Sequence, residues 1–169
     1  MTEEADRILA ELHLARGLAA APRPVGPAVS TAALWAHARR RLGAPVDLGT
    51  IRALREDPGA AARYRRLLEG LALAHAPVAL AASDGTMRRR LGPAELELHP
   101  SADGALMVLK GAGGARAIEV IPPEGEPCRL ALPAPEDGTV ILSLAPHAPE
   151  TGMALAALRD PGSAIFLLP

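Results

Sequence analysis

The first part of the chain repeats apolar residues at the spacing of a helix. Residues 3–18 place Ile8, Leu9 and Leu12 on one side and charged residues on the other, which predicts an amphipathic helix within residues 1–20. Three prolines then fall within residues 22–27. They exclude a helix and predict a semi-rigid linker over residues 21–29.

Residues 30–77 predict a helical region. Ser30, Asp47 and Asp57 are residue types that favour helix N-caps, and Pro58 suits the first position of a helix. We therefore expect one helix from Ser30 to near Gly43, a short one after Asp47, and a third from Pro58 to about His75. The first helix has an apolar stripe of Leu34, Trp35, Ala38 and Leu42, and the third is expected to bury Tyr64, Leu67, Leu68 and Leu71. The short helix contains Leu48, Ile51 and Leu54.

Beyond Pro77 the pattern changes from helical spacing to short apolar runs. Residues 94–99 alternate polar and apolar side chains, as a half-buried strand does. Turns rich in glycine and proline separate the runs. Strands are expected at 78–82, 94–99, 106–109, 117–121, 129–132, 140–144 and 165–168, with a helix at 151–158.

This order of elements predicts an α+β fold. N-terminal helices are followed by a β-rich region over residues 78–169, which forms a small antiparallel sheet or sandwich with a C-terminal helix and strand. We expect a meander of about five or six short strands, paired antiparallel. The 169 residues fit one domain, or two small ones that share a core.

Composition limits how the core is built and what the surface recognises. Trp35, Tyr64 and Phe166 are the only aromatic residues apart from the histidines, so aliphatic side chains must fill the core. The chain has no Asn or Gln, and Lys110 is its single lysine. This usage is typical of a GC-rich bacterial genome. It also removes the amide side chains that read adenine in DNA.

Charge is distributed unevenly along the chain. Residues 1–90 carry fourteen arginines against nine acidic residues, a net charge of +5, whereas residues 91–169 carry four basic and ten acidic residues, a net charge of −6. Such asymmetry orients a protein toward a partner or draws its own halves together.

Two arginine triplets stand out in the basic half. Arg39-Arg40-Arg41 is expected to close a helix, where cations favour the negative end of the helix dipole. Arg88-Arg89-Arg90 lies where the two halves meet. Both triplets together suggest phosphate contacts with nucleic acid. The scarcity of lysine and aromatic residues, and a near-neutral net charge, instead favour an acidic protein surface.

No motif identifies a reaction, a metal or a cofactor. Cys128, with His99 or His147 as a base, would suit a thiol hydrolase, and Ser83 lies in a Ser-Asp-Gly turn. No known nucleophile signature surrounds either residue. A lone cysteine is more often a small buried apolar residue. The histidines are scattered and none has ligand spacing, so we expect no metal site.

A short segment resembles a known helix. Asp57-Pro58, Arg63-Tyr64 and Leu67-Leu68 are similar to a helix of bacterial anti-sigma factors, in which a helical module clamps a sigma factor. The likeness covers a small part of the chain. The His-x-x-x-Cys-x-x-Cys zinc motif of many such proteins is absent, since the chain has one cysteine. We therefore assign no family.

These observations favour a regulatory or assembly subunit without catalytic activity that binds another protein through its helical half. The residues expected to contact the partner are Ile8, Leu9, Leu12, Arg39, Arg40, Arg41, Arg63 and Arg66. A small hydrolase using Cys128 or Ser83, and a nucleic-acid-binding protein using both arginine triplets, are the alternatives. The N-terminus does not resemble a secretory signal, and the longest apolar stretch is too short to span a bilayer, so the cytoplasm is the expected location.

Overall fold

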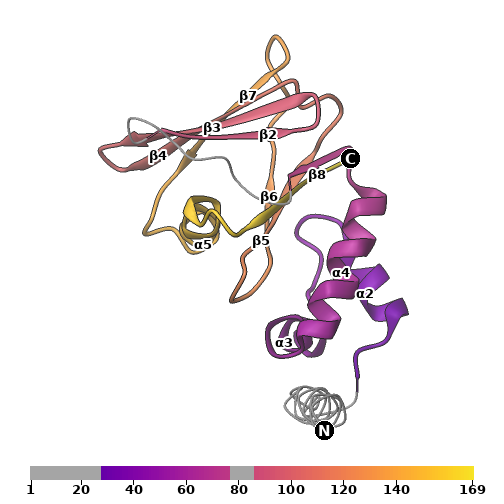
Figure 1. Ribbon diagram of the computed structural model, residues 1–169. Coiled ribbons are helices and arrows are strands. Elements are labelled where there is room, and N and C mark those ends of the chain that lie inside the picture. The colour runs from indigo at the N-terminus through magenta and orange to yellow at the C-terminus, as the bar shows by residue number, and fades with distance from the viewer. Residues whose placement is uncertain (1–27, 77–85) are drawn as a thin grey trace, which may run out of the picture.

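A computed structural model describes residues 28–76 and 86–169 of the chain (Figure 1). The helix predicted at 3–18, most of the linker predicted at 21–29, the strand predicted at 78–82 and Ser83 lie outside the described residues.

Three helices form the first part of the described chain: α2 (Thr31–Ala38), α3 (Leu48–Glu56) and α4 (Pro58–Leu71). Each begins at the predicted cap. The Ser30 hydroxyl accepts the N–H of Ala33 at 3.1 Å, and the Asp47 and Asp57 carboxylates accept N–H groups in the first turns of α3 and α4. These side chains satisfy donors that the helices leave without partners.

Two of the helices are shorter than predicted. α2 ends at Ala38 rather than near Gly43, because residues 39–43 turn and Gly43 adopts a φ of +76°. α4 ends at Leu71 rather than His75, because Ala72 is extended and the N–H of Leu73 donates to the carbonyl of Leu167 at 2.8 Å. That hydrogen bond brings the chain to the edge of a sheet, where Ala74–Ala76 form strand β1.

The strands form two antiparallel sheets rather than one meander in sequence order. Sheet A has the order β1-β8-β5-β6 and sheet B the order β2-β3-β4-β7. Sheet A comprises β1 (Ala74–Ala76), β8 (Ala164–Leu168), β5 (Ala117–Ile121) and β6 (Cys128–Ala131). Sheet B comprises β2 (Met87–Leu91), β3 (Ala94–Ser101), β4 (Gly104–Lys110) and β7 (Thr139–Leu144).

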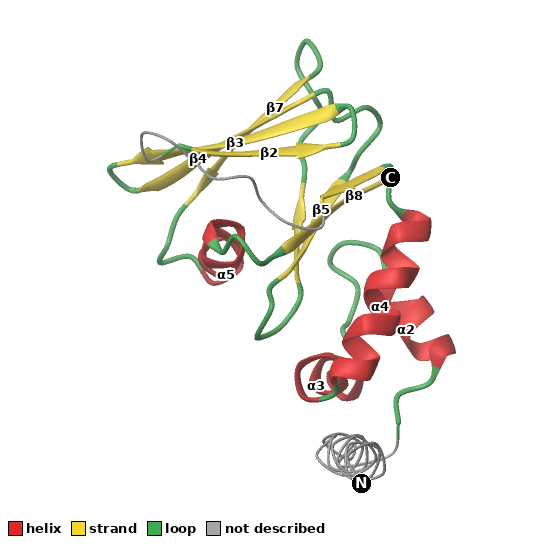
Figure 2. Ribbon diagram, viewed as in Figure 1, coloured by secondary structure: helices red, strands yellow, loops and turns green. Residues whose placement is uncertain are grey.

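Helix α5 (Pro149–Arg159) connects the two sheets. It was predicted at residues 151–158 and extends slightly beyond both ends. Leu155 and Leu158 are buried and point into the space between the sheets. Figure 2 shows α5 on the side of sheet A that sheet B occupies, while α2, α3 and α4 lie on the other side.

Sheet A is therefore the middle layer of the molecule. Along β5, Ile118 and Val120 enter a core shared with sheet B and α5, which we call the inter-sheet core. Ala117 and Ile121 face the opposite way, into a core shared with α2, α3 and α4, which we call the helix-side core. Since β5 and β8 are covered on both faces, every residue of these two strands is buried.

The structure confirms the α+β class and the antiparallel sheets. No helix among residues 28–76 and 86–169 is both long and apolar enough to cross a membrane.

Candidate functional site

The arginine triplet Arg39-Arg40-Arg41 follows α2 instead of forming its last turn. Arg39 and Arg41 are exposed, and the Arg39 guanidinium lies 5.7 Å from the centre of the Trp35 ring, within the range of a cation–π contact. Arg40 turns back, with one Nη 3.1 Å from the carbonyl oxygen of His37 and 3.0 Å from its Nε2. Two of the three arginines are thus left to the solvent. Within the described residues, none of the three forms an ion pair.

Large apolar side chains are exposed in the same segment of the chain. Trp35 is 41% exposed, Leu42 44%, Val46 41% and Leu48 79%. We call these four residues, together with Arg39 and Arg41, the α2–α3 surface. Trp35 and Leu42 were predicted to lie in the apolar stripe of a helix that ends near Gly43, but both are exposed. The early end of α2 turns Leu42 out of the helix stripe, and α3 buries Thr50 and Leu54 instead of Leu48.

A shallow cavity with a volume of about 280 Å³ lies in this region. It is bounded by α2, by the loop that follows it and by the first turn of α3. Its lining residues are Ala33, Ala36, His37, Arg40, Pro45, Asp47 and Thr50. The Asp47 carboxylate is already committed, because it accepts the hydroxyl of Thr50 at 2.6 Å as well as two backbone N–H groups. The cavity thus offers a mostly apolar depression between α2 and the start of α3.

His37 forms the inner wall of this cavity and is buried. Its pKa is lowered from 6.5 to about 4, mainly because burial disfavours the charged ring and further because Arg40 and Arg129 are close by. His37 is therefore neutral at pH 7. It acts as part of the wall rather than as a cation.

A buried polar network holds the triplet against sheet A. Arg129, on β6, donates to the carbonyl oxygens of Ala38 and Arg40 at 3.0 and 2.9 Å. The same guanidinium forms an ion pair with Glu119 on β5, and the Tyr64 hydroxyl donates to that carboxylate at 2.6 Å. Burial and the Glu119 charge raise the pKa of Tyr64, so its hydroxyl stays protonated. The network fixes the end of α2 and thereby the base of the α2–α3 surface.

This network was not predicted from the sequence. Its signal was the occurrence of Glu119 and Arg129 within otherwise apolar runs. The two residues are direct partners in the register of β5 and β6, but strand pairing between them becomes visible only once the fold is known.

The other residues predicted to contact a partner are placed differently. Arg63 is half-buried and donates to the carbonyl oxygen of Val29 at 3.2 Å, so it anchors the chain before α2. Arg66 is exposed on α4. Ile8, Leu9 and Leu12 lie outside the described residues, and their role stays a prediction.

The second triplet does not form one cationic patch. Residues 88–90 belong to β2, whose alternation exposes Arg88 and Arg90 and buries Arg89. Arg89 donates to backbone carbonyl oxygens of Ser163 and Asp160, near the start of β8. β2 was missing from the predicted strands because the three arginines conceal the inward positions of Met87 and Leu91.

The candidate nucleophile Cys128 is partly buried at the start of β6. Burial, and then the Glu119 charge, raise its pKa to about 12, whereas an activated thiol needs a lowered pKa. Its thiol lies 3.7 Å from the carbonyl oxygen of Val120. His99 is instead 3.0 Å from Glu97 on sheet B, and His147 is exposed. No hydrogen bond within the described residues joins Cys128 to a histidine.

Metal-binding geometry is also not found in this part of the chain. Across residues 28–76 and 86–169, no three His, Cys, Asp or Glu side chains group closely enough to hold an ion.

Comparison of the chain with protein-family models, with curated proteins and with solved structures finds no match.

Proposed function

We propose that this chain is a regulatory or assembly subunit without catalytic activity, and that its α2–α3 surface binds an acidic, amphipathic segment of another protein. The observation that carries the proposal is the exposure, within residues 35–48, of four large apolar side chains and of two arginines that lack ion pairs within the described residues, with the Arg39 guanidinium over the Trp35 ring. Exposed apolar groups bordered by charge are typical of interaction sites.

The charge of the helical part supports an acidic partner. Residues 28–76 contain eight arginines and four acidic residues, a net charge of +4. An acidic segment gains attraction during its approach and meets Arg39 and Arg41 at the rim, while its apolar side chains cover Trp35 and Leu42. The cytoplasm remains the predicted location for this interaction.

A designed pair of peptides tests the proposal. The first is a helix-forming peptide with leucines at positions i, i+3, i+4 and i+7 and glutamates elsewhere; the second replaces the glutamates by lysines. We expect the acidic peptide to bind and the basic one not to bind, as measured by fluorescence anisotropy at low and moderate salt. Equal binding of the two peptides, or no binding of the acidic one, would contradict the proposal.

Matched variants locate the binding site. The double variant Arg39→Glu, Arg41→Glu and the single variant Leu42→Ser should each lower the affinity for the acidic peptide about tenfold or more. A tenfold loss corresponds to a binding free energy of about 1.4 kcal/mol. Arg90→Glu and Ile141→Ser make the same replacements on the exposed face of sheet B, where Ile141 is 59% exposed, and should leave binding unchanged. Equal losses in both sets would place binding elsewhere.

Two further measurements separate the remaining hypotheses. Deleting residues 1–28 tests whether Ile8, Leu9 and Leu12 add to the interaction, since binding that survives unchanged assigns it to the α2–α3 surface alone. Salt-sensitive retention of duplex DNA or RNA by the intact chain, lost in the Arg39→Glu, Arg41→Glu variant, would favour nucleic acid as the partner instead.

A further inference from the structure

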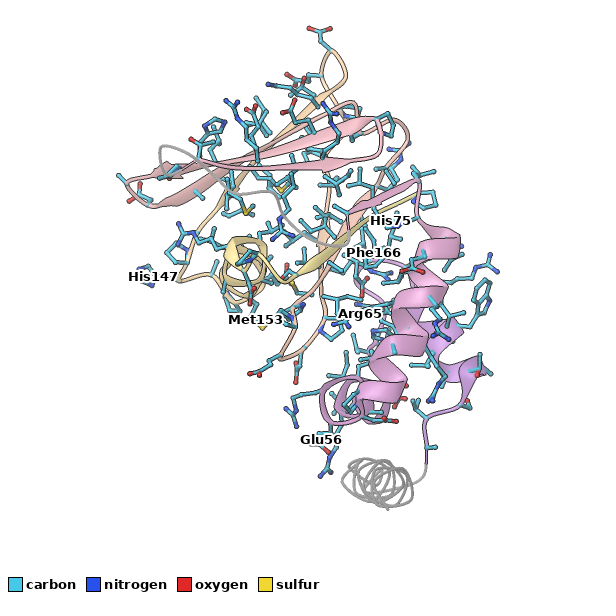
Figure 3. All side chains as sticks on the ribbon, viewed as in Figure 1. Glu56, Arg65, His75, His147, Met153 and Phe166 are labelled. Atoms are coloured by element: carbon cyan, nitrogen blue, oxygen red, sulfur yellow. The ribbon has the colours of Figure 1, made fainter. Side chains whose placement is uncertain are left out.

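A second cavity lies between α4 and sheet A, away from the α2–α3 surface. Its volume is 260 Å³. Arg65 and Glu69 of α4 form one wall, His75 and Phe166 of β1 and β8 form another, and Pro123 and Gly162 close its end. Figure 3 labels Arg65, His75 and Phe166, which lie along the seam where α4 meets the strands.

The guanidinium of Arg65 is incompletely satisfied in this cavity. One Nη is 3.4 Å from the carbonyl oxygen of Pro122, which is a weak hydrogen bond. Its Nε is buried and has no hydrogen-bond partner. Buried donors without a partner are rare, because burial removes their hydrogen bonds to water and no protein hydrogen bond replaces them.

The neighbouring carboxylate does not neutralise Arg65. Glu69 lies one helical turn further along α4, at the spacing that favours an ion pair. Within the described residues, however, no ion pair joins Arg65 to any carboxylate. The guanidinium is instead drawn toward the loop that follows β5. A half-buried guanidinium thus lines the cavity, and its buried Nε has no hydrogen-bond partner.

The rest of the cavity provides a planar, largely apolar wall. The His75 ring stacks on Phe166 with ring centres 5.9 Å apart and an interplanar angle of 20°. Gly162 packs closely against Pro123 at this end, because a Cβ there would approach Pro123 to 3.2 Å. A ligand that enters would meet a guanidinium on one side and a stacked ring pair on the other.

We propose that this cavity binds a carboxylate attached to a small planar or apolar group, with Arg65 as the residue that recognises it. Arginine presents Nε and one Nη side by side and pairs with both oxygens of a carboxylate. When the guanidinium exchanges its weak hydrogen bond with Pro122 for a carboxylate in the cavity, Nε gains the partner that it lacks. The same chemistry fits a free organic acid or an acidic side chain of a bound protein, and it does not depend on the function proposed for the α2–α3 surface.

Benzoate is the probe, with benzamide as its uncharged counterpart. Titration is followed by the Nε–H resonance of Arg65 and the ring resonances of His75 in NMR spectra of the full chain at pH 7. Benzoate should shift both sets of signals with saturation in the millimolar range, and benzamide should not. Shifts that fail to saturate, or equal shifts with benzamide, would overturn the proposal.

Three variants sharpen this test. Arg65→Gln should weaken benzoate at least tenfold, and Arg65→Lys, which keeps the charge but removes Nε, should weaken it as well. Arg66→Gln alters the exposed neighbour and should leave binding unchanged. Glu69→Gln should tighten benzoate binding, because it removes a like charge from the cavity wall. Unchanged affinity in Arg65→Gln, with an unfolding midpoint like that of the unmodified chain, would contradict the assignment.

Competition distinguishes the two sources of the carboxylate. If the acidic peptide described above displaces benzoate in the Arg39→Glu, Arg41→Glu variant, the carboxylate comes from a protein side chain. If benzoate binds while the peptide does not compete, the ligand is a free organic acid, and the α2–α3 surface is judged separately by its own variants.

Discussion

Glu119 and Arg129 show how single residues fix the position of a surface. Both are buried, and they are direct partners in the register of β5 and β6. Because both charges lose their hydration, such a pair contributes little net stability, but removing one partner leaves the other charge buried and unpaired. Here Arg129 also holds two carbonyl oxygens at the end of α2. The pair therefore orients the chain that leads into Arg39 and Arg41 more than it strengthens the fold.

His37 makes the stability of the protein depend on pH. Its pKa is about 4 in the folded chain against 6.5 for an ordinary histidine, because burial and the charges of Arg40 and Arg129 disfavour protonation more than Asp47 favours it. Between these values the unfolded chain binds the extra proton. The free energy of unfolding should thus fall by about 2 kcal/mol from pH 7 to pH 5.

Urea unfolding at the two pH values measures this loss. In His37→Gln the pH-dependent part should disappear, whereas His75→Gln, which alters an exposed histidine, should retain it. An identical slope in the His37→Gln variant would assign the effect to other groups.

At the scale of elements, two helical glycines have opposite roles. Gly70 in α4 has open space where a Cβ would be, whereas a Cβ at Gly152 in α5 would lie 2.4 Å from the carbonyl oxygen of Pro146. Gly70→Ala should raise the free energy of unfolding by about 0.5–1 kcal/mol through helix propensity. Gly152→Ala makes the same gain in propensity but clashes with fixed backbone, so it should lower stability.

Thermal unfolding of the two variants, followed by circular dichroism, shows whether each substitution raises or lowers stability. Stabilisation by Gly152→Ala would show that the loop before α5 moves freely away from the helix.

The elements also differ in how far they could be predicted from the sequence. Local signals placed α2, α3 and α4, because Ser30, Asp47 and Asp57 form their caps through neighbouring backbone. α5 was predicted from its spacing, although it lacks a side-chain cap. Long-range contacts decided the rest: the end of α4 is set by a hydrogen bond to Leu167, far along the chain.

The site was less predictable than the elements. Arg39 and Arg41 were identified from the sequence as candidates for contact, and both are exposed. Trp35 and Leu42 of the α2–α3 surface were expected in an apolar stripe, because helical spacing alone does not reveal that α2 ends at Ala38. The Arg65 cavity joins residues from three separate elements, and no spacing along the chain indicates such a group.

At the scale of the whole molecule, sheet A links the two cores. Alternate residues of β8 show this directly: Ile165 and Leu167 enter the inter-sheet core, and Phe166 and Leu168 enter the helix-side core. If either core is lost, one face of β5 and β8 becomes exposed, and these same strands also support the second core. We therefore expect the described part of the chain to unfold as one cooperative unit, even though the sequence suggests separate regions at 30–77 and 78–169.

Leu155→Ala tests this coupling from a distance. Leu155 is 2% exposed in α5 and belongs to the inter-sheet core, so its truncation should lower stability by about 3 kcal/mol. Trp35, the only tryptophan, lies in α2 on the other side of sheet A. Its fluorescence should nevertheless report the same lowered urea midpoint as far-UV circular dichroism. Met153→Ala, which alters an exposed residue of the same helix, should leave both midpoints nearly unchanged. If Leu155→Ala shifts the circular dichroism while the Trp35 transition stays in place, the helices α2–α4 fold independently of the two sheets.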